Sequence, residues 1–192
     1  SNIMYEALYG KDTGMYAIMF LNAEKIEEIV KQFDKVWIAN YNSPDQVVIA
    51  GDNKQLEKCS NICTESGGRK VIRLDVIGAF HSGLLKESSM KLKDVLDKYE
   101  FQTPNYPVVF NVTGEIETEN IPYLLQEQIY NSVQFIKSVE TMIENGVDTL
   151  IEIGPGRVLS GFVKKINRNV RVYSVDSVAD VEKVYKELGN EQ

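Results

Sequence analysis

The order of strand-like and helix-like segments between residues 13 and 75 is the feature that most constrains the fold of this chain. Residues 15–20 (MYAIMF) form an apolar run typical of a buried strand. The next segment carries Ile, Val and Phe at helical spacing, so we expect a helix capped by Asn22. The β-rich runs VWIANY and QVVIAG follow, and the Asn-Ser-Pro-Asp between them favours a turn, which predicts a hairpin.

A second helix and a further strand complete this region. Asn53 suits the N-cap of a helix whose apolar face includes Leu56 and Cys59, Gly67 ends it, and KVIRLDV predicts the strand. The resulting order, β-α-β-β-α-β, is that of the split βαβ or ferredoxin-like fold. Because this fold hosts many unrelated functions, the order alone indicates no particular chemistry.

The remainder of the chain alternates between strands and helices, which favours a parallel sheet. The expected segments are, in order, a helix with Leu92, Val95, Leu96 and Tyr99, a strand at VVFNV, a helix begun by Asn120 and Pro122, a helix capped by Ser132, the strand TLIEI, a helix after Gly154-Pro155-Gly156, the strand VRVYSV and a last helix with Val181 and Leu188. This α/β region looks incomplete, because it begins in the middle of an architecture that normally starts with its own strand.

The composition excludes several classes of protein. With 43% hydrophobic and 26% charged residues, the chain is too apolar to be disordered, and no apolar run approaches the ~20 residues that span a bilayer. Cys59 and Cys63 are too few for a disulfide framework and suit small core residues, so we expect a cytoplasmic location. The net charge of -7 disfavours binding to nucleic acid or to an anionic membrane.

A local basic cluster could still hold an anionic ligand. Lys164, Lys165, Arg168 and Arg171 form the candidate cluster, although a solvated helix face is the more common explanation of such a pattern. The Gly-Pro-Gly run at residues 154–156 could bring backbone N–H groups to an anion. It lacks the lysine of a P-loop and the third glycine of a dinucleotide motif, so a tight connector is the better interpretation.

His81 is the single histidine, and it lies where the two regions meet. An imidazole titrates near neutral pH and suits general-base work, although a lone histidine is more often structural than catalytic. The adjacent Ser82 cannot be its partner, since neighbouring side chains of an extended segment point apart. No G-x-S-x-G elbow, metal-ligand spacing or carboxylate pair stands out. The chain therefore has a candidate base and no obvious nucleophile.

Several strings resemble one family closely in their order and spacing. They are NSPDQVVIAG at 42–51, GAFHSGLLK at 78–86, QIYNSVQF at 128–135 and EIGPGRVLSGF at 152–162. Together they resemble the malonyl-CoA:acyl carrier protein transacylases of bacterial type II fatty-acid synthesis, from about Met4 to the last helix. The resemblance implies a ferredoxin-like subdomain at 13–75, inserted into an α/β-hydrolase-like acyltransferase domain whose C-terminal part is formed by residues 1–12 and 76–192.

The resemblance also implies roles for particular residues. His81 would be the general base, and the Gln128 position would supply a backbone carbonyl that holds the imidazole in the required tautomer, in place of a triad carboxylate. Asn42 matches a position that lines the acyl pocket, and Phe80 matches the residue before the histidine in malonyl-selective members. The implied reaction passes a malonyl group from CoA to a serine, and then to the phosphopantetheine thiol of acyl carrier protein. No metal or resident cofactor is implied.

Part of this machinery would lie before residue 1. The family's serine elbow, its N-terminal glutamine motif and the arginine that grips the malonyl carboxylate all precede that point, so we expect the chain alone to be inactive. A truncated sheet would expose an unpaired edge, which predicts self-association. Three alternatives stay open: a polyketide-pathway acyltransferase fragment, a non-catalytic module that binds acyl carrier protein or CoA, and a fragment without function.

Overall fold

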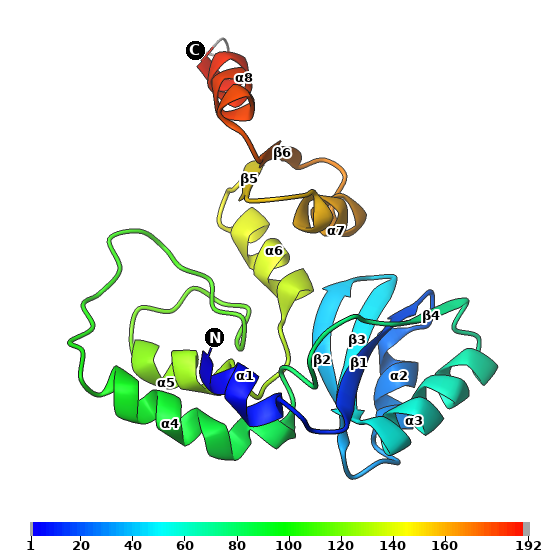
Figure 1. Cartoon of the computed structure of the whole chain (residues 1–192). Coiled ribbons are helices and arrows are strands. Elements are labelled where there is room, and N and C mark those ends of the chain that lie inside the picture. The colour runs from blue at the N-terminus through cyan, green and yellow to red at the C-terminus, as the bar shows by residue number, and fades with distance from the viewer. Residues whose placement is uncertain (1, 190–192) are drawn as a thin grey trace. The chain divides into compact units, whose positions relative to one another are not determined.

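The computed structural model describes residues 2–189, and Figure 1 shows the order of their helices and strands. The chain divides into two compact units, Ser1–Ser138 and Val139–Gln192, and each is described by itself. The predicted domain bounds at residues 1 and 192 lie outside the described residues. The finer division at residues 13–75 stays a prediction.

A four-stranded antiparallel sheet organises the first unit, with the strand order β2-β3-β1-β4 (Figure 1). Its strands are β1 (Thr13–Met19), β2 (Val36–Ser43), β3 (Gln46–Asp52) and β4 (Lys70–Arg73). Two helices join them, α2 (Ala23–Val30) and α3 (Asn53–Glu65). The order along the chain, β1-α2-β2-β3-α3-β4, confirms the predicted β-α-β-β-α-β order.

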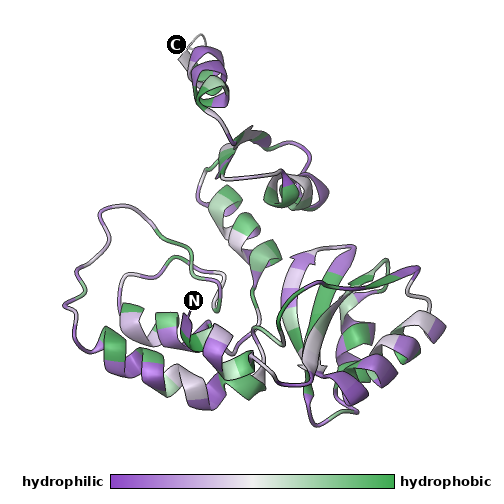
Figure 2. Ribbon diagram, viewed as in Figure 1, coloured by the Kyte–Doolittle hydropathy of each residue, from purple (hydrophilic) through white to green (hydrophobic). Residues whose placement is uncertain are grey.

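One face of this sheet packs against the two helices. Ile18 and Ile49 of the sheet share a buried cluster with Ile26 of α2 and with Leu56 and Cys59 of α3. The helices are amphipathic, and Figure 2 shows their ribbons alternating between green and purple. Burial of the green stripes against the sheet supplies the main apolar contact of this layer.

The opposite face of the sheet receives the segment that leads to His81. Met15, Ala17, Val48 and Ala50 form a buried cluster there with Ala79. Side chains alternate between the two faces of a strand, so Ala17 and Ile18 serve different layers. The small alanine side chains allow the segment around Ala79 to approach the sheet closely.

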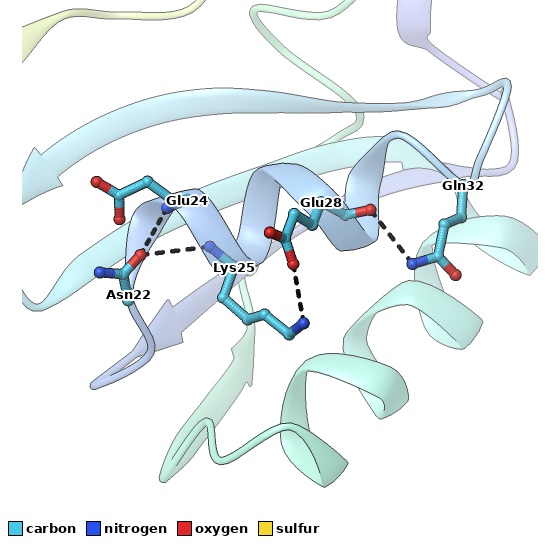
Figure 3. A network of polar contacts seen from close by, with 5 residues as sticks. All are labelled: Asn22, Glu24, Lys25, Glu28 and Gln32. Atoms are coloured by element: carbon cyan, nitrogen blue, oxygen red, sulfur yellow. Dashed lines mark hydrogen bonds and ion pairs between the residues drawn. The ribbon is translucent and has the colours of Figure 1, made fainter.

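Asn22 caps α2, as predicted. Its Oδ1 accepts hydrogen bonds from the backbone N–H groups of Glu24 at 2.8 Å and Lys25 at 3.3 Å (Figure 3). Lys25 also forms an exposed ion pair with Glu28, whose carbonyl accepts from Gln32 Nε2. A side-chain cap of this kind contributes about 1 kcal/mol to helix stability.

The prediction that Asn53 caps α3 is wrong by one residue. Asp52 is the cap, and its carboxylate accepts from the backbone N–H of Gln55 at 3.2 Å. Asn53 is the first helical residue, and its Nδ2 donates to Asp12 at 2.6 Å. Asp and Asn are equally good caps, so two neighbouring candidates could not be separated by residue type.

The rest of the first unit is mostly helical. Its elements are α1 (Asn2–Leu8), the 3-10 turn η1 (Gly83–Leu85), α4 (Lys86–Leu96), α5 (Ile121–Glu127) and the start of α6 (Phe135–Glu144). Leu8, Leu85 and Ile129 form a third buried cluster, against which Phe80 and Tyr130 pack. Ala79 before His81 belongs to the cluster on the sheet, and Leu85 after it belongs to this one. The segment that carries His81 is therefore anchored in both clusters.

The predicted strand VVFNV is not found among residues 2–189. A single bridge joins Val109 to Ile116, and the chain turns between them, with the N–H of Gly114 donating to Phe110 O at 2.8 Å. Val108 is exposed. Valine-rich segments become strands only where a neighbouring strand supplies pairing and burial, and the described residues supply only that bridge.

The second unit contains a pair of parallel strands. They are β5 (Thr149–Ile153) and β6 (Arg171–Val175), accompanied by α7 (Val158–Ile166), α8 (Val178–Gly189) and the end of α6. Their parallel pairing confirms the prediction for this region. Ile153 of β5 is 83% exposed, although strands of parallel sheets are normally buried.

None of the helices within residues 2–189 has the length and apolar character needed to cross a membrane.

Candidate active site

His81 sits in a tight, strained turn between β4 and η1. Its φ of +53° lies in the left-handed region, which costs a residue other than glycine on the order of 1–3 kcal/mol. Several hydrogen bonds hold the turn: Thr13 Oγ1 accepts from the N–H of Ala79 at 3.2 Å, and Ser82 Oγ donates to Ala79 O at 2.7 Å. Strain of this kind is typical of functional positions.

The His81 side chain is held by the backbone carbonyl of Gln128, with Nδ1 2.8 Å from the oxygen. A carbonyl oxygen can only accept, so Nδ1 carries the proton of the neutral ring and Nε2 keeps a free lone pair. Burial lowers the pKa of His81 from its ordinary value, and the Gln128 carbonyl opposes this shift in part. The imidazole is therefore neutral at pH 7, with its basic nitrogen at Nε2.

The Gln128 carbonyl is available because α5 ends one residue earlier. The last carbonyls of a helix lack an N–H one turn ahead, so they need other partners. Glu127 O accepts from the N–H groups of Tyr130 and Asn131, at 3.2 and 3.1 Å. Gln128 O is the next carbonyl along, and it accepts from His81 instead.

The segment after Gln128 is fastened to strand β2. The N–H of Val133 donates to Ala39 O at 2.8 Å, and Val133 O accepts from the N–H of Tyr41 at 3.0 Å. Ser132 Oγ donates to Ile38 O at 2.6 Å. Ser132 was expected to cap the following helix, and this expectation is wrong, since its hydroxyl is used to tie the loop to the sheet. No local sequence signal distinguished these two uses of a serine.

Phe80 and Asn42, the two residues predicted to line an acyl pocket, make different contacts in the structure. Phe80 is half-buried and packs against both the Ala79 and the Leu85 clusters. Asn42 lies near the end of β2, and its Nδ2 donates to Gln46 Oε1 across the hairpin at 3.0 Å. The role of either residue in an acyl pocket stays a prediction.

The basic cluster and the glycine turn at 154–156, which were the two candidate anion sites, make contacts within the protein. Lys164 Nζ donates to Val170 O at 2.7 Å, and Arg171 pairs with Asp148 at 3.3 Å, so these two members of the basic cluster are engaged within the second unit. After the 154–156 glycine turn, the first N–H groups of α7 donate to the carboxylate of Glu152. This carboxylate occupies the position of an external anion, which supports the interpretation of a connector.

A metal centre finds no support in the described part of the chain, where no group of three or more His, Cys, Asp or Glu side chains is placed to hold an ion. Cys59 and Cys63 are free thiols buried in the first core, as expected. The hydrogen bond between them and their burial raise the pKa of Cys59, so this thiol stays protonated. Both cysteines therefore act as packing residues.

Comparison with solved structures gives close matches over nearly all of the chain. A malonyl CoA-acyl carrier protein transacylase from Clostridium perfringens superposes with a TM-score of 0.94 at 42% identity, covering 99% of this chain and 61% of that one. A malonyl-transacylase solved in complex with a type II PKS acyl carrier protein gives a TM-score of 0.93 at 36% identity, covering 97% and 62%. These matches place the fold in the α/β-hydrolase-like acyltransferase class.

Curated proteins give a narrower match. Malonyl CoA-acyl carrier protein transacylase of Bacillus subtilis (strain 168) is 38% identical over 194 residues, covering 98% of this chain and 61% of that protein. The enzyme of the same name from Staphylococcus aureus (strain MSSA476) is 39% identical over 173 residues, covering 87% and 56%. No protein-family model matches the chain.

The chain is similar to malonyl CoA-acyl carrier protein transacylases over nearly its whole length, and it spans about three fifths of the length of the curated relatives that it matches. This confirms the resemblance carried by the four strings of the sequence. The partial coverage is consistent with a match to the C-terminal portion of those relatives.

Proposed function

We propose that the chain carries the general base of an acyltransferase that moves a malonyl group from CoA to acyl carrier protein. The observation that carries this proposal is the hydrogen bond between His81 Nδ1 and Gln128 O, in a chain similar to malonyl CoA-acyl carrier protein transacylases. A neutral imidazole with a free Nε2 is the group that a serine hydroxyl needs, because the hydroxyl is a poor nucleophile until a base removes its proton.

The proposed reaction has two halves. His81 Nε2 takes the proton of a serine hydroxyl while the serine oxygen bonds to the malonyl thioester carbon. The carbon–sulfur bond then breaks, and the CoA sulfur leaves with the proton from the imidazolium. In the second half His81 deprotonates the phosphopantetheine thiol of acyl carrier protein, and the sulfur bonds to the carbonyl carbon of the acyl-serine ester. The ester carbon–oxygen bond then breaks, and the serine oxygen leaves with the proton from the imidazolium.

We place the serine nucleophile on a segment outside these 192 residues. Ser82 is fully buried, and its hydroxyl donates to Ala79 O at 2.7 Å, so it has no access to an acyl group. No G-x-S-x-G elbow occurs in the chain. The chain alone is then inactive, and activity requires the segment that bears the serine.

We assign the acyl pocket to the surroundings of His81, with Phe80 and Asn42 as its candidate lining. Phe80 is half-buried beside the histidine, and Asn42 is half-buried on β2, the strand that holds the loop after Gln128. Malonyl-CoA and acyl carrier protein are the proposed partners, with no metal or resident cofactor in the reaction. The free, buried Cys59 and Cys63 support a reducing, cytoplasmic location.

The experiment that tests this function is a transfer assay with labelled malonyl-CoA and acyl carrier protein. The 192-residue chain is assayed alone, then mixed with a separately produced segment of a relative that bears the serine motif. We expect transfer in the mixture and none from either piece. Transfer by the chain alone would overturn the placement of the nucleophile, and carrier binding without transfer in a folded mixture would favour a non-catalytic binding module.

A polyketide setting is a second candidate, favoured by one comparison. A solved relative with 36% identity is a malonyl-transacylase in complex with a type II PKS acyl carrier protein. Running the same mixture with a fatty-acid carrier and with a polyketide carrier separates the two settings. A higher kcat/KM for the polyketide carrier would favour the second candidate.

A further inference from the structure

The turn that follows α5 contains an amide side chain that the mechanism above does not use. We propose that Asn131 is a positioning residue, which closes this turn around Glu127 and so aims the Gln128 carbonyl at His81. The catalytic meaning of this contact rests on the proposed function. The geometric claim is independent of it.

Asn131 contacts Glu127 through three hydrogen bonds. Its Nδ2 donates to Glu127 O and to Glu127 Oε2, each at 2.9 Å, and its backbone N–H donates to Glu127 O at 3.1 Å. Glu127 and Asn131 flank Gln128, so these bonds close the chain on both sides of the carbonyl that His81 uses. A turn held in this way leaves the peptide group after Gln128 little freedom to rotate.

The Glu127 carboxylate is held by a second donor from the same turn. The hydroxyl of Tyr130 donates to Glu127 Oε1. Tyr130 also packs against the Leu8 and Ile129 cluster, which joins the turn to a buried core. Asn131 thus belongs to a closed set of contacts in which each member restrains the others.

The far end of the loop is restrained separately. Ser132 and Val133 bond to the backbone of β2, as described above. Asn131 precedes this far anchor in the chain, and its amide bonds to Glu127 at the near end. Loss of its amide frees the residues around Gln128 while both anchors stay in place.

The test measures the tautomer of His81 directly. His81 is the single histidine of the chain, so the two ring nitrogens of ¹⁵N-histidine-labelled protein give NMR signals that need no assignment. In the wild-type chain at a pH where the ring is neutral, we expect the proton to reside on Nδ1. In Asn131→Ala we expect the ratio of the Nδ1–H to the Nε2–H form to fall about fivefold, the change that loss of one typical hydrogen bond supports.

Asn145 offers a matched control. Its Nδ2 donates to Thr141 O at 2.8 Å and its N–H donates to the same oxygen at 3.1 Å, the same pattern at the end of another helix. Asn145→Ala should cost comparable local stability but leave the His81 tautomer unchanged. An Asn131→Ala variant with the wild-type tautomer ratio, or an equal change in Asn145→Ala, would overturn the proposal.

Folding of each variant is checked by circular dichroism and by the fluorescence of Trp37, the single tryptophan. If Asn131→Ala does not fold, Asn131→Asp replaces it, because its side chain keeps the same size but, as a carboxylate, cannot donate a hydrogen bond to Glu127. The same fall in the tautomer ratio is expected, and an unchanged ratio counts against the proposal. Because the tautomer measurement needs no acyl transfer, a failure of this proposal is distinct from a failure of the proposed function.

Discussion

At the scale of single residues, His81 combines two opposing influences. Burial disfavours the charged imidazolium and lowers the pKa, while the Gln128 carbonyl stabilises the protonated ring and raises it. The balance lies on the side of the neutral form. A group that is neutral at rest and has a fixed tautomer can accept a proton at Nε2 without first rearranging.

The lowered pKa of His81 predicts a pH dependence of stability. Between the folded-state pKa and the ordinary value of 6.5, the unfolded chain binds more protons than the folded chain, so the free energy of unfolding rises with pH. This stability is present above pH 6.5 and is lost as pH falls through the folded pKa. Urea titrations at pH 7.5 and at about pH 5, where ordinary carboxylates are still ionised, measure the difference.

The matched variant for that measurement is His81→Gln, which cannot titrate. We expect its free energy of unfolding to change less between the two pH values than that of the wild-type chain. An equal change in both proteins would show that another group is responsible, and that His81 is not held neutral by burial.

At the scale of elements, the turn η1 depends on a close approach between backbone and an aromatic ring. A Cβ atom at Gly83 would lie 2.7 Å from the Trp37 ring of β2, well inside contact distance. We expect Gly83→Ala to destabilise the chain by about 1–3 kcal/mol, because the ring must move in a packed environment. The same change at Gly161, which faces open space in α7, should be neutral or slightly stabilising. Denaturant unfolding of both variants is the measurement, and equal effects would contradict this account.

Some strands could be predicted from the sequence pattern and others could not. The strands of the first sheet were predictable because their apolar pattern matches burial on the side of α2 and α3. The strand prediction for VVFNV failed because its residues have the propensity of a strand but form only a single bridge among the described residues. Propensity describes a segment alone, whereas a strand needs a partner.

The candidate site was predictable only where a motif pointed to it. His81 stood out as a lone histidine at a junction, and the Gln128 contact was implied by a family resemblance. The contributions of Asn131 and Ser132 were not predicted, because their partners, Glu127 and Ile38, are chosen by the turn and by long-range packing. Hydrogen bonds that span 94 positions in the chain leave no local signature.

At the scale of the whole molecule, the second unit leaves apolar side chains in water. The residues exposed on its strands and helices are Ile151, Ile153, Val158, Leu159, Val178, Val181 and Tyr185. Exposed apolar side chains in this number are typical of an interaction site, and each of the two strands has one side without a partner among the described residues. Contact of these side chains with another copy of the chain would explain the predicted self-association.

The exposed strand β5 makes that association testable. We expect Ile153→Lys to lower the associated fraction in sedimentation velocity, because a charge on this strand opposes burial of the edge. Ile72→Lys on β4, an edge strand of the other sheet, serves as the control and should change little. A monomeric wild-type chain, or a larger effect from Ile72→Lys, would contradict the assignment to β5.

The measurement that tests the central claim most directly compares wild-type chain and His81→Ala in the reconstituted malonyl transfer assay, with the same serine-bearing segment in both mixtures. Loss of a general base lowers the rate by about 10²–10⁴-fold, and a loss in that range is predicted here with the two mixtures equally folded. Transfer by His81→Ala at the wild-type rate would contradict the account, because it would leave the histidine and its carbonyl partner without a role in the chemistry.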